Sequence, residues 1–186
     1  KIISQYHKKI ELTPETKKQI EQPFTPDPKQ PNVKSVKDIL QMTKYHTSKG
    51  EKTEEALAIK GFVDFVKENE KEGQVILVAH NANFDRKFIS VRSNLYGIEK
   101  LNNKTIDTLE LVYEFFYPLL IVADKENLMS KMKTAKGMPS FTLGTLTAAL
   151  KIENKDWHSA LADVNSLIGV TQEIVNYLKK QKDIDV

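Results

Sequence analysis

Apolar residues follow two patterns along this chain, a short unbroken run and several stretches with the period of a helix. The unbroken run covers residues 75–79 (Val-Ile-Leu-Val-Ala) and ends abruptly in small polar residues and Asp85. Such a run favours a strand buried on both faces, as in a parallel sheet covered by helices, where ligands bind beyond the carboxyl ends of the strands. We therefore expect Asp85 at a sheet edge where a site can form. On this stretch alone, a polar loop in which Asp85 caps the next helix is an equally good interpretation.

Periodic apolar positions predict helices in most of the remaining sequence. Ser35 is placed to cap a short helix, and Thr-Glu-Glu from Thr53 gives a longer helix a favourable first turn. The last helix has the clearest pattern, with apolar residues recurring at helical spacing from Ser159 to Leu178. A short strand is expected over 104–108, so strands alternate with helices and the chain is α/β. The expected helices cover residues 35–42, 53–72, 88–96, 109–116, 142–150 and 159–178.

Three segments are less regular. Residues 2–10 have the alternation of an amphipathic strand. Five prolines between Pro14 and Pro31 forbid a continuous helix or a central strand, so residues 14–32 are expected to form an extended connector or lid. Residues 119–140 carry four lysines together with Gly137 and Pro139, and we expect an exposed loop there with one short helix inside it.

Composition narrows the class of protein. The 186 residues fit one domain, and 40% of them are hydrophobic, which is enough for a core. The formal charge is +3, and Arg86 and Arg92 are the only arginines. Lysine binds phosphate as a point charge, so any nucleic-acid contact should be directed at the backbone; a solvated lysine surface is the alternative. With no cysteine, membrane-span pattern or signal peptide, we expect a cytoplasmic protein without disulfides or thiolate chemistry.

The second candidate for chemistry is the stretch over residues 158–163, which begins with His158 and ends with Asp163. On a continuous helix these two side chains would diverge by roughly 140 degrees, so they converge only if His158 lies just before the helix. An imidazole beside an anchored carboxylate then suits metal-assisted hydrolysis, with the carboxylate holding a cation and the imidazole taking a proton from water. For His158 alone, a capping or core role is the alternative.

Four segments, taken in order and spacing, resemble the DEDDh family of 3'-5' exonucleases, and most closely the proofreading domain of bacterial DNA polymerase III. They are residues 80–85 (His-Asn-Ala-Asn-Phe-Asp), 106–111 (Ile-Asp-Thr-Leu-Glu-Leu), 140–146 (Ser-Phe-Thr-Leu-Gly-Thr-Leu) and 158–163 (His-Ser-Ala-Leu-Ala-Asp). The resemblance covers about residues 53–178. It implies a ribonuclease H-like mixed sheet flanked by helices, in one exonuclease-like domain. Its expected parts are a meander strand and Pro-rich connector (1–34), an α/β core (35–116 and 141–180) and a Lys-rich excursion (117–140).

The resemblance also implies roles for particular residues. Asp85 and Asp163 would bind metal, with two Mg2+ or Mn2+ ions in the intact site, and His158 would be the general base. Asp107 matches a position that is structural in the family rather than catalytic. The expected substrate is the 3' end of single-stranded or frayed nucleic acid, DNA or RNA, and a DNA polymerase is an expected partner. The residues expected to contact the terminal nucleotide are His80, Asn81, Asn83 and Phe84.

Two departures from the family pattern qualify this function. The first motif, Asp-x-Glu-Thr, is absent before Asp85, and the His-Gly-Ile-Thr turn that follows it has no counterpart. Two ions carry four positive charges, of which Asp85 and Asp163 offset half, so these residues alone should hold at most one ion, weakly. We expect residues upstream of Lys1, or another chain, to supply the missing strand and carboxylates; otherwise the chain should be inactive. The alternative function is a nuclease-like module that binds nucleic acid or a polymerase without cutting; an unrelated α/β protein is a third interpretation.

Overall fold

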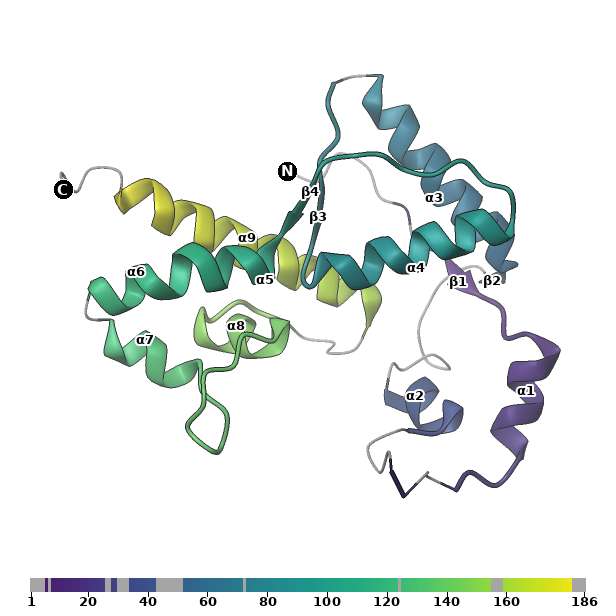
Figure 1. Cartoon of the computed structure of the whole chain (residues 1–186), viewed down its shortest axis with the longest axis horizontal. Helices are drawn as coiled ribbons and strands as arrows, with labels where there is room; N and C mark the ends of the chain where they lie inside the picture. Colours follow the sequence, from purple (N-terminus) through teal and green to yellow (C-terminus); the bar gives the residue numbers. More distant parts are fainter. Residues whose placement is uncertain are drawn as a thin grey trace.

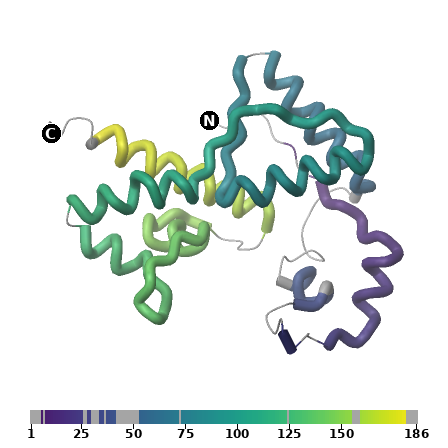
Figure 2. The backbone as a smooth tube through the Cα atoms, viewed as in Figure 1, coloured from purple at the N-terminus to yellow at the C-terminus, as the bar shows by residue number. Residues whose placement is uncertain are grey.

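The fold consists of helices arranged around short parallel strand pairs (Figure 1). The structure is a computed structural model that describes residues 6, 8–25, 28–29, 34–42, 52–71, 73–123, 125–154 and 159–181. Figures 1 and 2 show α1 and α2 together at one end of the molecule, α5 to α9 at the other, and α3, α4, β3 and β4 between them. The elements in chain order are β1 (Lys9–Ile10), α1 (Pro14–Glu21), α2 (Val36–Met42), β2 (Lys52–Thr53), α3 (Glu55–Glu70), β3 (Leu77–Ala79), α4 (Ala82–Leu95), β4 (Thr105–Asp107), α5 (Thr108–Leu111), the π-helix η1 (Val112–Phe116), α6 (Tyr117–Val122), α7 (Glu126–Lys131), α8 (Leu143–Ala149) and α9 (Ala160–Gln181).

The central strands pair in parallel, which confirms the α/β class. Leu77 is opposite Thr105 and Ala79 is opposite Asp107, so β3 and β4 end side by side. The expectation of a long strand buried on both faces was wrong: only three of the five apolar residues are strand, and Ile76 and Val78 are 44% and 39% exposed. In the described part of the chain this sheet has two strands. A ribonuclease H-like sheet remains a prediction.

Two long helices flank this strand pair and pack on each other. The apolar stripe of α3 turns Ala58, Ile59, Val63 and Val66 into the interior, as its period predicted. A bidentate ion pair joins α3 to α4, in which Arg92 donates to Glu55 at 2.5 and 2.6 Å. The two helices therefore have a fixed relation on one side of β3.

The main apolar core lies among the helices that follow β4. It draws on α6, α8, α9 and the segment after α7, and Phe116 and Tyr177 meet edge to face with ring centroids 5.2 Å apart. The helices expected over 142–150 and 159–178 are confirmed as α8 and α9, and Thr142 caps α8 by accepting from the Thr145 N–H at 3.2 Å. The buried members of this core are Val112, Phe116, Leu120, Met132, Phe141, Leu146, Ala149, Val170 and Ile174.

The helix after β4 continues past Pro118, beyond the limit of 116 that the sequence suggested. The turn that precedes the proline is a π-helix, in which the N–H of Tyr117 donates to the carbonyl of Val112. Pro118 then stands in the first turn of α6, where a missing N–H costs little. Residues 119–122 are consequently helical, and the short helix expected within 119–140 is α7.

The proline-rich segment also contains a helix, so the expected connector without helix was wrong there. Pro14 occupies the first turn of α1, and the hydroxyl of Thr13 caps it by accepting from the N–H of Thr16 at 3.1 Å. Ser35 caps α2 as expected, accepting from the N–H of Asp38 at 3.0 Å. Of the strand expected over 2–10, residues 9–10 are strand, whereas 2–5 and 7 lie outside the described residues.

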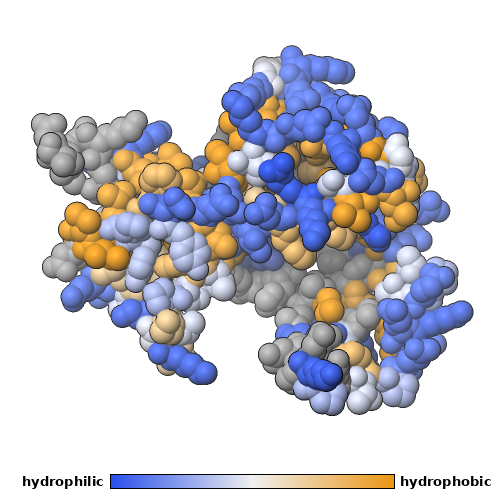
Figure 3. All heavy atoms as spheres, in the orientation of Figure 1, coloured by the Kyte–Doolittle hydropathy of each residue, from blue (hydrophilic) through white to orange (hydrophobic). Residues whose placement is uncertain are grey.

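The surface retains apolar side chains. Figure 3 shows them gathered at the outer end of α6, where Ile121 and Val122 are exposed. No helix in the described ranges has the length and apolar character needed to cross a bilayer.

Candidate active site

The end of β4 supplies the anchor of the site. The carboxylate of Asp107 accepts hydrogen bonds from the backbone N–H groups of Asn81 at 3.0 Å, Ala82 at 2.7 Å and Leu109 at 2.9 Å. Asn81 adopts the left-handed conformation, with a φ of 66°, so the chain turns sharply from β3 into α4. These contacts confirm the structural role expected of Asp107, because one carboxylate fixes the turn that leads to Asp85.

His80 ties three separate segments together. Its Nδ1 lies 3.0 Å from the Thr108 hydroxyl, and its Nε2 lies 2.8 Å from the carbonyl oxygen of Phe141. Burial lowers the pKa of His80, although the Phe141 carbonyl and the charge of Asp107 oppose this shift. In the neutral ring, Nε2–H donates to the carbonyl, and Nδ1 is left facing the Thr108 hydroxyl, which donates to the carbonyl of Ala79 at 3.2 Å. Both ring nitrogens thus lie against polar atoms of other segments, and His80 holds β3 against α5 and the segment before α8.

Asp85 lies in the first turn of α4. Asn81 takes the N-cap position, so the alternative in which Asp85 caps this helix was wrong. Loss of hydration raises the pKa of Asp85; its own backbone N–H opposes that shift, and the negative charge of Asp107 adds to it. The ionised carboxylate therefore stands in surroundings that a bound cation would stabilise.

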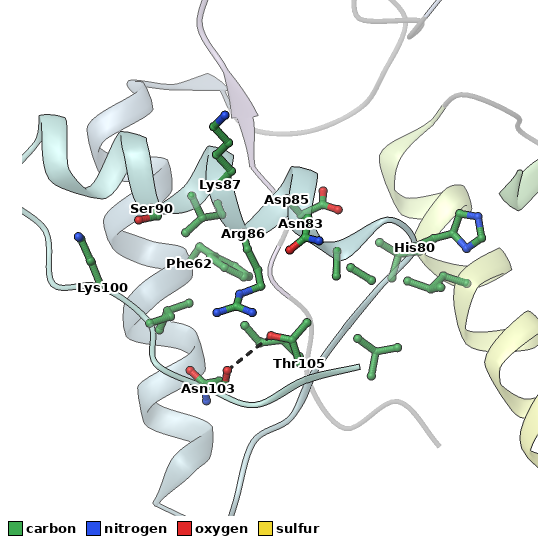
Figure 4. Close-up of a pocket in the computed structure, with 18 of the residues that line it drawn as sticks. Phe62, His80, Asn83, Asp85, Arg86, Lys87, Ser90, Lys100, Asn103 and Thr105 are labelled. Carbon is green, nitrogen blue, oxygen red and sulfur yellow. Dashed lines mark hydrogen bonds between the residues drawn. The ribbon is translucent and has the colours of Figure 1, made fainter. Parts of the chain in front are cut away.

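A cavity of about 1050 Å³ has both predicted metal ligands in its lining. Asp163 lines it from the first turn of α9. Asp85 lines it from α4, and His80 and Asn83 also contribute to its wall (Figure 4). Asn81 and Phe84 do not belong to this lining, and Phe84 is 70% exposed. Of the residues predicted to contact a nucleotide, two thus share the cavity with the carboxylates.

The predicted base, His158, lies outside the described residues, as do residues 155–157. The helix that carries Asp163 begins at Ala160, and the N–H of Asp163 donates to the carbonyl of Ser159 at 2.9 Å. The helix start agrees with the sequence pattern. The pairing of His158 with Asp163 stays a prediction.

The binding of Mg2+ or Mn2+ by Asp85 and Asp163 stays a prediction. Among the described residues no group of three His, Cys, Asp or Glu side chains is placed to hold a metal. Asp85, Asp163 and Asn83 all line the cavity, so two carboxylates and one amide border it. Mg2+ is commonly bound in this way, by one or two carboxylates with water and substrate oxygens completing its octahedron.

The sequence did not indicate several other cavity residues. Phe62 of α3, Arg86 of α4 and Thr105 of β4 line the same cavity, and no motif in the sequence singles them out. The contact between Thr108 and His80 was also missed. Its only signal is a small polar residue directly after a strand, which also fits an ordinary turn.

Comparisons with known proteins point to bacterial DNA polymerases. The chain is 31% identical over 125 residues, 66% of its length, to the DNA polymerase III PolC-type of Listeria monocytogenes and to that of Listeria welshimeri. It is 36% identical over 102 residues, 55% of its length, to the DNA polymerase III PolC-type of Bacillus cereus. The chain spans about 6–7% of the length of these curated relatives. No protein-family model matches the sequence, and no solved structure matches the fold.

Proposed function

We propose that this chain is a metal-dependent 3'-5' exonuclease domain that removes nucleotides from single-stranded or frayed DNA ends during replication. The observation that carries the proposal is that Asp85 and Asp163 both line one cavity, whose wall also includes residues of β3 and β4. The similarity to PolC-type polymerases supports a role in DNA replication, in the cell interior and beside a polymerase.

In this proposal, the chain's residues prepare a water molecule to attack a phosphodiester. His158 accepts the proton of the water, whose oxygen forms a bond to phosphorus while the bond to the 3' oxygen of the preceding nucleotide breaks and that oxygen is protonated by solvent. Asp85 and Asp163 would hold Mg2+ or Mn2+, which supplies positive charge to the phosphate oxygens. Asp107 and His80 are positioning residues that keep the turn before α4 in place.

A second function is favoured by a specific observation. The described residues provide no third carboxylate or imidazole to complete a metal site, and catalysis with two ions requires more ligands than two carboxylates. A nuclease-like module that binds single-stranded nucleic acid or a polymerase without cutting would need only the cavity. Binding without release of nucleotides distinguishes this function from the first.

The test is incubation of the 186-residue chain with a 3'-labelled single-stranded oligonucleotide and Mn2+. We expect release of labelled mononucleotide that D85N, D163N and H158A abolish. D64N is the matched control, because Asp64 is a surface carboxylate paired with Lys60 at 2.5 Å. Binding of the oligonucleotide without release assigns the chain to the non-cutting module, and neither binding nor release rejects both functions.

A further inference from the structure

The two arginines of this chain stand on the same helix and have different surroundings. Arg92 is neutralised, because its guanidinium forms the bidentate pair with Glu55, which also accepts from the hydroxyl of Tyr96 at 2.7 Å. Arg86 takes part in none of the ion pairs among the described residues. Arg92 follows Arg86 by six positions, which places the two side chains roughly 120 degrees apart around α4. Arg92 thus joins α3 to α4, whereas the guanidinium of Arg86 has no ion-pair partner among the described residues and can bind an anion.

Arg86 directs its charge into the cavity. Figure 4 shows its guanidinium projecting from α4 toward the part of the wall formed by Phe62, Asn103 and Thr105. Asp85, the next residue back on α4, leaves the helix in another direction but lines the same cavity. The lining therefore holds two carboxylates, Asp85 and Asp163, and the cationic side chains of Arg86, Lys87 and Lys100, of which Arg86 is the only arginine.

The chemistry of Arg86 suits a phosphate group. A guanidinium presents a planar fork of donors that matches phosphate oxygens in a bidentate manner. Much of the remaining wall is apolar, including Phe62 and Leu101, and Arg86 itself is exposed, so an incoming phosphate can reach its guanidinium. The ring of Phe62 beside it is a surface on which a base can stack, an interaction that every base can make.

The extent of the cavity lets one ligand contact groups of both charges. Its volume of about 1050 Å³ lies at the upper end of the range of about 300–1,000 Å3 for small-molecule pockets, and its lining includes both the carboxylates and Arg86. We infer that Arg86 binds a backbone phosphate of a single-stranded nucleic acid whose 3' end lies at Asp85 and Asp163. This inference rests on the proposed function for the placement of the 3' end. The contact to the backbone makes it independent of base sequence.

The experiment measures binding without cleavage. The probe is a fluorescent oligothymidylate of about twelve nucleotides, long enough to fill a single-strand groove, followed by anisotropy in EDTA over a series of salt concentrations. R86Q should weaken binding about tenfold, the loss expected for a charged hydrogen bond. It should also reduce the slope of log affinity against log salt by about 0.7, the value for one phosphate contact on a single strand. R86K should restore the slope but only part of the affinity, because lysine lacks the bidentate fork.

R92Q is the matched control, since it removes the same charge from the same helix. It should lower the thermal midpoint by breaking the pair with Glu55, and leave the salt slope unchanged. Equal effects of R86Q and R92Q on binding, or no binding by the wild-type chain, would overturn the inference. If the chain binds through Arg86 but releases no nucleotide, the phosphate contact is supported and the exonuclease function is rejected. If the chain releases nucleotide and R86Q binds with unchanged affinity, the exonuclease function is supported and the phosphate contact is rejected.

Discussion

The carboxylate of Asp107 accepts the backbone N–H of Ala82 at 2.7 Å, which joins the end of β4 to the first turn of α4. Asp85 stands in that same turn, so a residue from the next strand determines where this candidate metal ligand lies. The parallel register reinforces the relation, because Asp107 is opposite Ala79, shortly before the turn. The site thus depends on a carboxylate that is not itself among its proposed metal ligands.

Replacing Asp107 with asparagine should destabilise the fold. One oxygen can still accept from Asn81 and Leu109, but the new amide then faces the N–H of Ala82 as a second donor, and that N–H loses its partner. An unsatisfied partner of a charged hydrogen bond costs about 1–3 kcal/mol. Urea unfolding of D107N measures this loss of unfolding free energy.

The control for D107N is D64N, which removes a carboxylate from a surface pair. The Lys60–Asp64 pair is exposed, and such pairs contribute about 1 kcal/mol or less. D64N should therefore change stability less than D107N does. Similar losses in the two variants would show that Asp107 does not anchor the turn.

The stability of the fold should decrease on mild acidification because of His80. Its pKa is lowered in the folded chain, so the unfolded chain binds a proton first, near pH 6.5, and stability falls from there down to the lowered pKa. H80Q cannot titrate and retains a donor for the Phe141 carbonyl. Between pH 7 and 5, the free energy of unfolding of H80Q should therefore fall less than that of the wild type. Parallel pH profiles for the two proteins would contradict the role given to burial.

Elements with a complete local signal were predictable from the sequence. α8 has both a capping threonine, Thr142, and apolar spacing, and α9 has a long apolar stripe. The error at α1 arose because Pro14 was treated as a helix breaker, although a proline after a capping residue such as Thr13 suits a first turn. The exposure of Val78 could not be predicted, since the burial of a strand depends on neighbours distant in sequence.

The sequence named candidate site residues, whose roles stay predictions, but it gave no arrangement for them. The resemblance paired Asp85 with Asp163, and the structure places both on one cavity. The two hydrogen bonds of His80 join residues 28 and 61 positions away, and no local pattern carries that information. Arg86 was noted for its rarity, whereas its direction depends on how α4 packs.

Removing the charge of Asp85 should stabilise the fold while it abolishes nuclease activity. The pKa of Asp85 is raised in the folded chain, so its ionised form costs stability above that pKa, and the cost disappears as the pH falls below the unfolded value of about 3.9. D85N should raise the thermal midpoint at pH 7, by a gain below about 1 kcal/mol because the side chain is solvent-accessible. The gain should shrink at pH 4. A lower midpoint at pH 7 would contradict the loss of hydration that, together with the smaller repulsion by Asp107, raises this pKa.

Asp85 and Asp163, the two carboxylates of the cavity, should together bind one Mn2+ ion. Asp85 and Asp163 together neutralise the charge of a single divalent cation, and no third ligand side chain gathers with them in the part of the chain that the structure describes. A ligand that binds only the folded state stabilises it by about 2.7 kcal/mol at a hundredfold excess over its dissociation constant. Mn2+ should therefore raise the thermal midpoint of wild type and of D64N, but not that of D85N or D163N. Electron paramagnetic resonance counts the bound ions, and two ions per chain would show that residues beyond these carboxylates complete the site.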